Sequence, residues 1–441
     1  MQYFLNAKNI RSWLVTRHAQ ELLAVFSIQA FSLFTSFAIS LIITNLLGAA
    51  AYGVFSYGFS WVNLMAVFSC MGFEQLALKE IPAYRAQGRK DLMHGYFKYA
   101  TKRILLLSII VSVFLFFLSW LLRQPNDSSL RTGLWLAIPA LPVIAMINLR
   151  FAWLRSFHFN SLSQFPDKVI RPLVFLAMLL AAYLFYDRGL NIFMVIIMSG
   201  ISILLALIVG NYYIQKKVLT TVEDVPAIYE KPRWRKVALS LFIVNGIYFY
   251  LSQLQILMLG SFKGAAETGI FAIASRLSDL EGYMLFALNV VLAPIISRLF
   301  AEQKLAELQT VITRTLWFGF LFSLPLITGF LMFPSFCLSF FGDEFGSGKN
   351  ALIILTLSQV VNFATGSVGY MLTMTGHQKT AIKLLLLTAA LTTLLSFILI
   401  PILGINGAAI SAAVNNIVLN VLMAIAVYKK TGINSTLLRL K

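Results

Sequence analysis

Long runs of apolar residues dominate the chain, and short polar segments that carry most of its charge separate them. The first run covers residues 22–73 without one charged side chain. A helix needs about 20 residues to cross a bilayer, so this run predicts two membrane-spanning helices joined by a tight turn at residues 48–53. The hydrophobic pattern therefore predicts an all-α polytopic membrane protein.

The same criterion locates further apolar spans along the rest of the sequence. No polar segment between them exceeds about thirty residues, which leaves no room for a separate soluble domain. The first 21 residues carry charges without a small-residue cleavage pattern, so we interpret them as a retained segment, not a signal peptide. Twelve transmembrane helices are expected, the ten after the first pair lying near 104–122, 133–153, 172–186, 191–214, 237–262, 270–297, 315–333, 351–375, 384–402 and 408–427.

The basic residues predict the orientation of these spans. With the N-terminus inside, 28 of the 35 Lys and Arg residues fall in cytoplasmic segments and only five fall in external loops. Positively charged loops remain on the cytoplasmic side of a membrane. Because the opposite topology would invert the bias, both termini are predicted to be cytoplasmic.

An internal repeat divides the twelve spans into two sets of six. Residues 48–56 recur as residues 264–272, with both glycines, two alanines and the phenylalanine in register. Six spans return the chain to its starting side, so the halves should be related by a pseudo-twofold axis along the membrane normal, as in parallel-repeat transporters. The predicted domains are an N-terminal lobe at 1–215, a flexible cytoplasmic linker at 216–236 and a C-terminal lobe at 237–441.

The composition supports this class and excludes others. Hydrophobic residues make up 59% of the chain and charged residues 12%, whereas soluble domains average about 25% charged. The net charge of +18 does not indicate a nucleic-acid partner, because the chain has too little polar material for a wetted surface. The sequence shows no nucleotide-binding motif, metal-ligand spacing or nucleophile–base pair. We therefore expect a carrier without catalytic residues, cofactors or metals.

Three ionisable residues lie together in the eighth span, where charge is costly and functional by default. They are Arg276, Asp279 and Glu281, and the helical rise places Glu281 near the middle of the bilayer. Arg276 and Asp279 share a face, whereas Glu281 points about 200° away from Asp279. Two interpretations remain open. Either Arg276 and Asp279 form a packing ion pair while Glu281 bonds a neighbouring helix, or the cluster lines a solvated path in which Arg276 attracts anions and a carboxylate titrates or gates.

Other polar residues in or near the spans are weaker candidates. Glu74 lies at the cytoplasmic edge of the membrane, where it could have either a structural or a gating role. Arg150, at the inner end of its span, either faces the pathway or extends to the lipid headgroups. Several amides either line a cavity or join neighbouring helices; they are Gln29, Asn63, Asn245, Gln253, Gln255, Asn362 and Asn415.

Several short motifs, spread over most of the chain, resemble those of the O-antigen and polysaccharide flippases. That family belongs to the superfamily of multidrug, oligosaccharidyl-lipid and polysaccharide exporters. The resemblance is carried by residues 48–55 as a G-x-x-x-Y-G-x-[FY] turn and by residues 276–279 as an R-L-S-[ED] stretch. Residues 72–74 followed by Lys79, residues 341–345 and residues 404–409 fit the same pattern.

The resemblance implies two six-helix lobes around a central cavity that flip an undecaprenyl-pyrophosphate-linked oligosaccharide by alternating access. A pyrophosphate requires Arg or Lys donors, which Arg276 and Arg150 could supply, while Gln29, Asn63, Asn245 and Tyr248 could bind sugar. Coupling to an ion gradient would use Asp279 or Glu281, with Glu74 as a gating candidate. The implied location is the bacterial inner membrane, in O-antigen or lipopolysaccharide biosynthesis. The implied partners are membrane lipids, a polysaccharide polymerase and a chain-length regulator.

Two alternatives remain open. A cation-coupled multidrug antiporter of the same superfamily would require a net acidic cavity, which Arg276 disfavours. A non-transporting scaffold of a polysaccharide-assembly complex would leave the buried charges of the eighth span with a packing role only.

Overall fold

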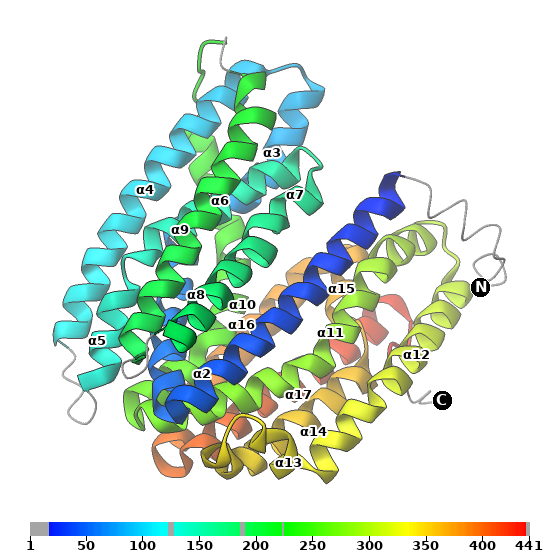
Figure 1. The fold of residues 1–441 in the computed structure, drawn as a ribbon. Coiled ribbons are helices and arrows are strands. Elements are labelled where there is room, and N and C mark those ends of the chain that lie inside the picture. The colour runs from blue at the N-terminus through cyan, green and yellow to red at the C-terminus, as the bar shows by residue number, and fades with distance from the viewer. Residues whose placement is uncertain (1–16, 122–127, 186–189, 223–224, 438–441) are drawn as a thin grey trace. The chain divides into compact units, whose positions relative to one another are not determined.

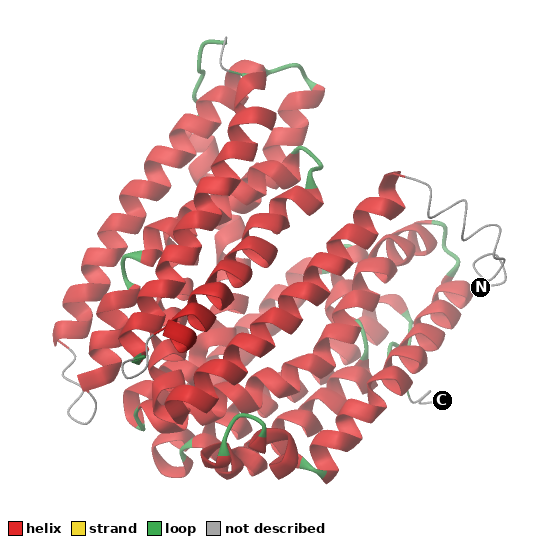
Figure 2. Cartoon of the chain, viewed as in Figure 1, coloured by secondary structure: helices red, strands yellow, loops and turns green. Residues whose placement is uncertain are grey.

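The structure, a computed structural model, consists of helices joined by short turns (Figures 1 and 2). It describes residues 17–121, 128–185, 190–222 and 225–437, and in these ranges it contains no strand. The all-helical prediction is therefore confirmed for the described residues. Most of the predicted N-terminal segment lies outside them, as do the external residues Arg123 and Arg188.

The described helices group into two compact units. Unit 1 contains residues 1–43 and 58–246, and unit 2 contains residues 44–57 and 247–441. This division differs from the expected lobes in two places. The short segment 44–57, from the N-terminal half, packs in unit 2, and the first half of the predicted seventh span packs in unit 1.

Unit 1 is built on helices whose apolar side chains point both inward and outward, as expected of membrane helices. On α4, for example, Leu106, Phe114 and Leu121 are more than half exposed, whereas Tyr96 and Ile104 are fully buried. Its helices are both ends of α2 (Arg17–Cys70), α3 (Phe73–Ala86), α4 (Lys90–Leu121), α5 (Ser128–Ala137), α6 (Ala140–Ser156), α7 (Asn160–Phe165), α8 (Arg171–Phe185), α9 (Ile192–Lys217) and the start of α10 (Lys231–Phe262).

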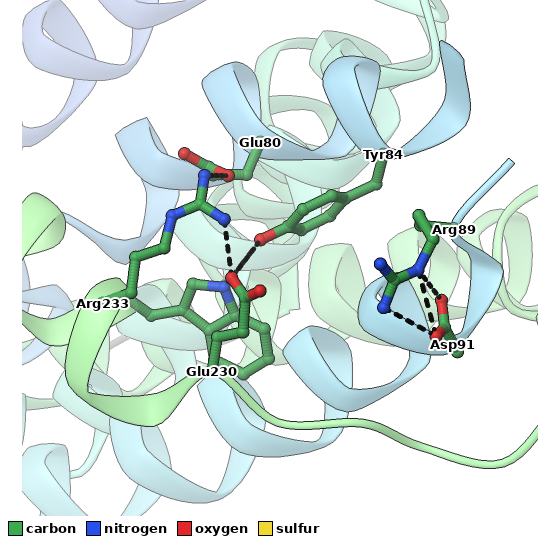
Figure 3. Close-up of polar contacts among 7 residues, drawn as sticks. Glu80, Tyr84, Arg89, Asp91, Glu230 and Arg233 are labelled. Atoms are coloured by element: carbon green, nitrogen blue, oxygen red, sulfur yellow. Dashed lines mark hydrogen bonds and ion pairs between the residues drawn. The ribbon is translucent and has the colours of Figure 1, made fainter. Parts of the chain in front are cut away.

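The predicted linker is held against unit 1 by specific contacts. The backbone N–H of Ile228 donates to the Asp91 carbonyl at 3.1 Å. Beyond it, Arg233 bridges the carboxylates of Glu80, at 2.9 Å, and Glu230, at 2.6 Å (Figure 3). Trp234, fully buried, donates its indole N–H to the Tyr84 hydroxyl at 2.9 Å. The described part of this segment is therefore attached to α3 and α4 and differs from the flexible connection that its prolines and charges suggested.

Removing the guanidinium of Arg233 should destabilise this attachment. Glu80 is only 5% exposed, so Arg233→Ala leaves a buried carboxylate without its counter-ion, at a cost of about 1–3 kcal/mol. We expect the thermal unfolding midpoint in detergent to fall by several degrees. Arg89→Ala is the control, because the Arg89–Asp91 pair in Figure 3 is exposed and should contribute little. Equal midpoints for the two variants would contradict the bridging role of Arg233.

Unit 2 has the same all-helical construction and includes one broken span. Its α14 ends at Thr365, and the next residue, Gly366, has a φ of 78° that interrupts the helix before α15. Besides the end of α10, its elements are α11 (Ala265–Ala301), α12 (Leu305–Met332), α13 (Pro334–Ser339), a 3-10 turn (Asp343–Gly348), α14 (Lys349–Thr365), α15 (Val368–Met374), α16 (Gln378–Leu403) and α17 (Ile405–Thr431).

The two copies of the sequence repeat adopt the same backbone conformation and contact each other. Gly48 has φ 78° and ψ −178°, and its counterpart Gly264 has φ 88° and ψ −172°. Such positive φ values favour glycine. The helices that follow cross so closely that a methyl group at Gly53 would overlap the Ala265 carbonyl oxygen, and one at Gly269 would overlap the carbonyl of Ala49. The two short motifs therefore share a local structure, and the relation of two six-helix lobes by a pseudo-twofold axis stays a prediction.

The predicted turn over residues 48–53 is therefore shorter than expected. Only Gly48 leaves the helical region, and α2 resumes directly after it. Gly53 is helical and serves the close crossing instead of a turn. The reason is physical: one residue with a positive φ suffices to redirect the chain, whereas the second glycine removes the side chain at a backbone contact.

Polar contacts hold segment 44–57 within unit 2. The Asn45 side chain donates to the Phe340 carbonyl at 2.8 Å, and the Ala49 N–H donates to the Glu344 carboxylate at 2.9 Å. Glu344 thus caps the helix that restarts after Gly48, where a negative charge is favourable. Glu267 contacts the start of α17 in the same way, accepting from the Ile405 N–H at 3.1 Å.

Nine helices of the described residues are long and apolar enough to cross a membrane, or ten if the bent pair α5–α6 forms one span. This count treats α2 as a single helix, although its 54 residues would extend about 80 Å without the break at Gly48. It also omits α11, the helix of the three charges. A multi-pass membrane protein is confirmed, and the number twelve stays a prediction, as do the cytoplasmic termini.

Residues 433–437, after α17, fold back against the break between α14 and α15. The side chain of Gln309 makes two hydrogen bonds to the backbone of Asn434, at 2.6 and 2.8 Å. The N–H of Leu437 donates to the Ala364 carbonyl at 2.8 Å. The bond from Leu437 thus satisfies a carbonyl near the end of α14 that the interrupted helix leaves unpaired.

Candidate functional site

Helix α11 positions the three predicted charged residues in unit 2. The half-buried guanidinium of Arg276 donates to the hydroxyl of Tyr52 at 3.0 Å. Tyr52 belongs to segment 44–57, which the crossing at Gly53 and Gly269 places against α11. Two motifs that are distant in sequence, G-x-x-x-Y-G and R-L-S-D, therefore meet at one hydrogen bond.

Arg276 makes the side-chain hydrogen bond described above to a neutral group. Within the described residues, no ion pair at 4.0 Å or less joins Arg276 to Asp279 or to another carboxylate. Arg276 instead uses a neutral phenol. The charge of Arg276 nevertheless acts on Asp279, so both interpretations of the cluster stay open.

Asp279 and Glu281 occupy opposite environments, as the helical rotation between them predicts. Asp279 is exposed and lines a cavity, whereas Glu281 is 1% exposed. The hydroxyl of Thr356 on α14 lies close enough to interact with the Glu281 carboxylate, but among the described residues neither carboxylate oxygen makes a hydrogen bond of good geometry. A charged carboxylate in such surroundings is strongly disfavoured, so Glu281 is suited to hold a proton.

The cavity at Asp279 measures about 200 Å³ and is lined largely by hydroxyl and amide groups. We call it the Asp279 cavity. Helices α10, α11, α14 and α17 contribute its polar side chains, among them Gln255, Ser275, Ser278, Asp279, Gln359 and Asn416. Of the amides singled out from the sequence, Gln255 lies here.

Gln359 and Asn416 were missed by sequence reasoning. A single amide in an apolar helix can either line a cavity or join two helices. Two amides on the same face of a helix indicate a polar surface more clearly. Gln359 precedes Asn362 by three residues, and Asn416 precedes Asn420 by four, spacings that place both amides on one helix face. Asn415, which was singled out, instead accepts a hydrogen bond from Thr392 at 3.0 Å.

Unit 1 contains five of the predicted site residues. Gln29 donates to the side chain of Gln164 at 2.7 Å, a bond between α2 and α7. The guanidinium carbon of Arg150 lies 4.5 Å from the ring centroid of the fully buried Trp153, a cation–π contact. Asn63 and Asn245 are half-buried.

The fifth residue of unit 1, Glu74, lies on α3 beyond the apolar part of α2. It is 9% exposed, and one of its carboxylate oxygens has no hydrogen-bond partner among the described residues. Burial raises the pKa of Glu74 to about 7, although the charge of Arg155 acts in the opposite direction. Glu74 can therefore change its protonation state near neutral pH, which suits a gating residue and is compatible with a structural one.

The remaining predicted residue, Tyr248, lies on the part of α10 in unit 2 and is 48% exposed. Unit 2 thus holds Tyr248 together with the charged residues of α11, and unit 1 holds the other predicted residues. That both groups face one substrate cavity stays a prediction.

Sequence comparisons identify the family. The profile described as "Polysaccharide biosynthesis protein" matches residues 19–300, well over half of the chain and including Tyr52, Arg276 and Asp279. The chain belongs to this family. A second profile, MatE, matches residues 240–398, and both lie within the multidrug, oligosaccharidyl-lipid and polysaccharide exporter superfamily predicted from the motifs.

Two archaeal proteins are similar in sequence. An uncharacterized membrane protein of Methanocaldococcus jannaschii is 24% identical over 382 residues, covering 81% of this chain and 74% of the relative. A probable low-salt glycan biosynthesis flippase, Agl15 of Haloferax volcanii, is 26% identical over 180 residues, covering 41% of this chain and 38% of the relative.

Solved structures with the same fold are transporters and flippases. An inward-facing multidrug resistance MATE family transporter of the MOP superfamily gives a TM-score of 0.70 at 15% identity, covering 93% of this chain and 99% of the other. The lipid II flippase MurJ, in an inward closed conformation, gives a TM-score of 0.69 at 15% identity, covering 93% of this chain and 87% of the other. This family member therefore has a transporter fold, in agreement with the expectation that it is not an enzyme.

Proposed function

We propose that the protein is a flippase that moves a lipid-linked oligosaccharide across the membrane by alternating access of its two lobes. The observation that carries the proposal is the match of the polysaccharide biosynthesis profile to residues 19–300. The similarity of part of the chain to a probable glycan biosynthesis flippase supports the same substrate class.

The chemistry of α11 supports a pyrophosphate headgroup as the charged part of the substrate. Arg276 carries a positive charge that no carboxylate neutralises within ion-pair distance among the described residues. Guanidinium groups bind phosphate oxygens through paired, charge-assisted hydrogen bonds. Tyr52 orients the guanidinium, which reduces the conformational entropy lost on binding.

The motifs quoted above suggest undecaprenyl pyrophosphate as the carrier lipid and the bacterial inner membrane as the location. The two sequence relatives are archaeal, so we propose the general class, a polyprenyl-linked oligosaccharide, ahead of O-antigen in particular. A polymerase and a chain-length regulator are the proposed partners, since both act on the flipped repeat unit.

A multidrug antiporter is the second candidate, and three observations favour it. The MatE profile covers residues 240–398, and several of the similar structures are multidrug transporters. The Asp279 cavity also carries one carboxylate among its lining residues, which could attract a cation.

Reconstitution into vesicles distinguishes these functions. The purified protein is supplied either with a fluorescent polyprenyl-pyrophosphate oligosaccharide or with a lipophilic cationic dye. A flippase exposes the labelled oligosaccharide to an external reagent and leaves the dye unmoved. Movement of the dye alone would establish the antiporter instead, and movement of neither would favour the scaffold.

Glu281 is the proposed proton carrier, and its neutral analogue should uncouple transport. Glu281→Gln preserves side-chain volume and removes the titrating group from its buried site. We expect it to abolish the acceleration of oligosaccharide movement by an imposed pH gradient, while movement without a gradient continues. Flipping is followed in vesicles with and without the gradient.

Glu307→Gln is the matched control, because Glu307 is an exposed carboxylate in the first turn of α12 in the same unit. It should retain the response to the pH gradient. A Glu281→Gln variant that also retains a full response would exclude Glu281 as the carrier without affecting the proposed substrate.

A further inference from the structure

After α17 the chain turns at Gly432, and the residues that follow pack against their own unit. Gly432 ends α17 with φ 70°, in the left-handed region that favours glycine. It is exposed, and a Cβ atom placed on it would meet no atom of the described residues within 4 Å. Residues 433–437 are not helical, and we call them the C-terminal strap. Packing therefore does not restrain the residue at which the strap leaves α17.

One glutamine of α12 binds the strap. The side-chain oxygen of Gln309 accepts a hydrogen bond from the Asn434 N–H at 2.8 Å, and its amide nitrogen donates to the Asn434 carbonyl at 2.6 Å. A glutamine amide carries both an acceptor and donors, so it can satisfy both backbone groups of one residue. The polar attachment of the strap to α12 thus depends on a single side chain.

The strap also contacts the break between α14 and α15. The Leu437 N–H donates to the Ala364 carbonyl at 2.8 Å. A Cβ atom placed on Gly366 would lie 2.7 Å from the carbonyl oxygen of Ser435 and 2.5 Å from Leu316 of α12. The strap, α12 and the break therefore meet at a residue that has no side chain.

Ile433 anchors the strap in the apolar core of unit 2. It is 2% exposed and belongs to the cluster of buried side chains that includes Leu308 of α12, Phe363 of α14 and Met371 of α15. At the other end of the strap, Leu437 packs against the same cluster and stays partly buried. The strap thus joins α12 to the helices on both sides of the break.

Two hydroxyl groups at this contact are buried without being satisfied. Ser435 of the strap is 2% exposed, and Ser367, which follows Gly366 in the break, is 3% exposed. Among the described residues, neither hydroxyl has a hydrogen-bond partner. Burial of an unsatisfied hydroxyl costs free energy, and undocking of the strap would return Ser435 to water. This cost makes undocking easier, so the contact is suited to open and close.

We propose that the C-terminal strap is a reversible restraint on transport: while docked it holds α12 on the α14–α15 break, and its release lets the broken span move. Hinges are a few residues that absorb large changes in φ and ψ, and Gly366 is such a residue. Residues 366–370 also line a cavity of about 230 Å³ in unit 2, so movement of the break would reshape that cavity. The effect on flipping rests on the proposed function, whereas the docking itself does not.

Docking is tested by thiol labelling, which requires no transport. In a background of Cys70→Ala and Cys337→Ser, Ser435→Cys reports on the strap, because this side chain is buried while the strap is docked. We expect Gln309→Ala to raise its rate of reaction with a water-soluble maleimide at least tenfold. Gln309→Glu should give an intermediate rate, since a carboxylate keeps the acceptor and loses the donor.

Thr310→Ala is the matched control for Gln309→Ala. Thr310 is the next residue on α12, it is exposed, and its hydroxyl donates to the Ala306 carbonyl of its own helix at 2.9 Å. It should leave the labelling rate of Ser435→Cys unchanged. Equal rates in the Gln309→Ala and Thr310→Ala proteins would overturn the docking.

The restraint on transport is tested by locking the strap. Ala364→Cys and Leu437→Cys, introduced together in the same cysteine-free background, are joined by a short cross-linker that a reductant cleaves. We expect the locked protein to move the labelled oligosaccharide in vesicles at least tenfold more slowly than before cross-linking, and the reductant to restore the rate. Ala364→Cys alone, treated identically, should be unaffected.

Release of the strap should have the opposite effect on transport. We expect Gln309→Ala to move the labelled oligosaccharide severalfold faster than Thr310→Ala. A locked protein that flips at the full rate, or a Gln309→Ala protein no faster than its control, would overturn the restraint even if the protein is a flippase. A wild type that moves no oligosaccharide would overturn the proposed function and with it the restraint on flipping, whereas the labelling rates would still decide the docking.

Discussion

Gly53→Ala is expected to lower the free energy of unfolding by at least about 3 kcal/mol, the upper range for overpacking, because the added methyl overlaps a backbone carbonyl that cannot rotate away. The same holds for Gly269→Ala, which meets the carbonyl of Ala49. Relief requires the two helices to separate, which would also weaken the bond between Arg276 and Tyr52. The unfolding midpoint in detergent measures the effect.

The control is Gly329→Ala on α12 of the same unit. A Cβ atom at Gly329 meets no atom within 4 Å, so the variant should match wild type or gain slightly from reduced backbone freedom in the unfolded chain. The double variant of Gly53 and Gly269 should cost less than the two single ones together, since one displacement relieves both overlaps. Two results would refute the close helix crossing at Gly53 and Gly269. One is that the destabilisations of the two single variants add up exactly in the double variant, and the other is that Gly53→Ala has the same unfolding midpoint as Gly329→Ala.

Arg276→Ala is expected to reduce oligosaccharide flipping roughly 100-fold. The estimate follows from one or two charge-assisted hydrogen bonds to a phosphate, each contributing about 1.5–3 kcal/mol. Arg276→Lys should retain part of the activity, because an ammonium keeps the charge and loses the paired geometry. Tyr52→Phe should lose less than Arg276→Ala, since it removes only the group that orients the guanidinium.

Arg298→Ala provides the comparison for this series. Arg298 lies in the last turn of the same helix and is exposed, so its removal should leave flipping unchanged. The defect in Arg276→Ala should also depend on the headgroup and disappear for a labelled lipid that lacks phosphate. Normal flipping of the pyrophosphate substrate by Arg276→Ala would exclude the headgroup role.

The sequence predicts the helices well because a membrane span needs a long apolar run, and such runs are visible without structural information. The opposite orientations of Asp279 and Glu281 follow from helical rotation alone. The repeat was visible too, since Gly48 and Gly264 are fixed by a backbone conformation that few other residues adopt.

Contacts between distant segments could not be predicted in this way. Nothing in the pattern near Glu344 indicates that its carboxylate caps Ala49, almost 300 residues earlier, or that Tyr52 binds Arg276. The Asp279 cavity was equally inaccessible, because its polar lining comes from four helices. The linker appeared flexible from its prolines and charges, yet the tertiary contacts of Arg233 and Trp234 hold it.

The exchange of segment 44–57 into unit 2 has a consequence for synthesis of the protein. This segment leaves the ribosome some 200 residues before the helix that packs against Gly53 has been made. Its polar groups, including the Ala49 N–H that later meets Glu344, must wait in the membrane without their final partners. Expression of residues 1–246 alone would therefore leave segment 44–57 without the surface on which it packs in unit 2.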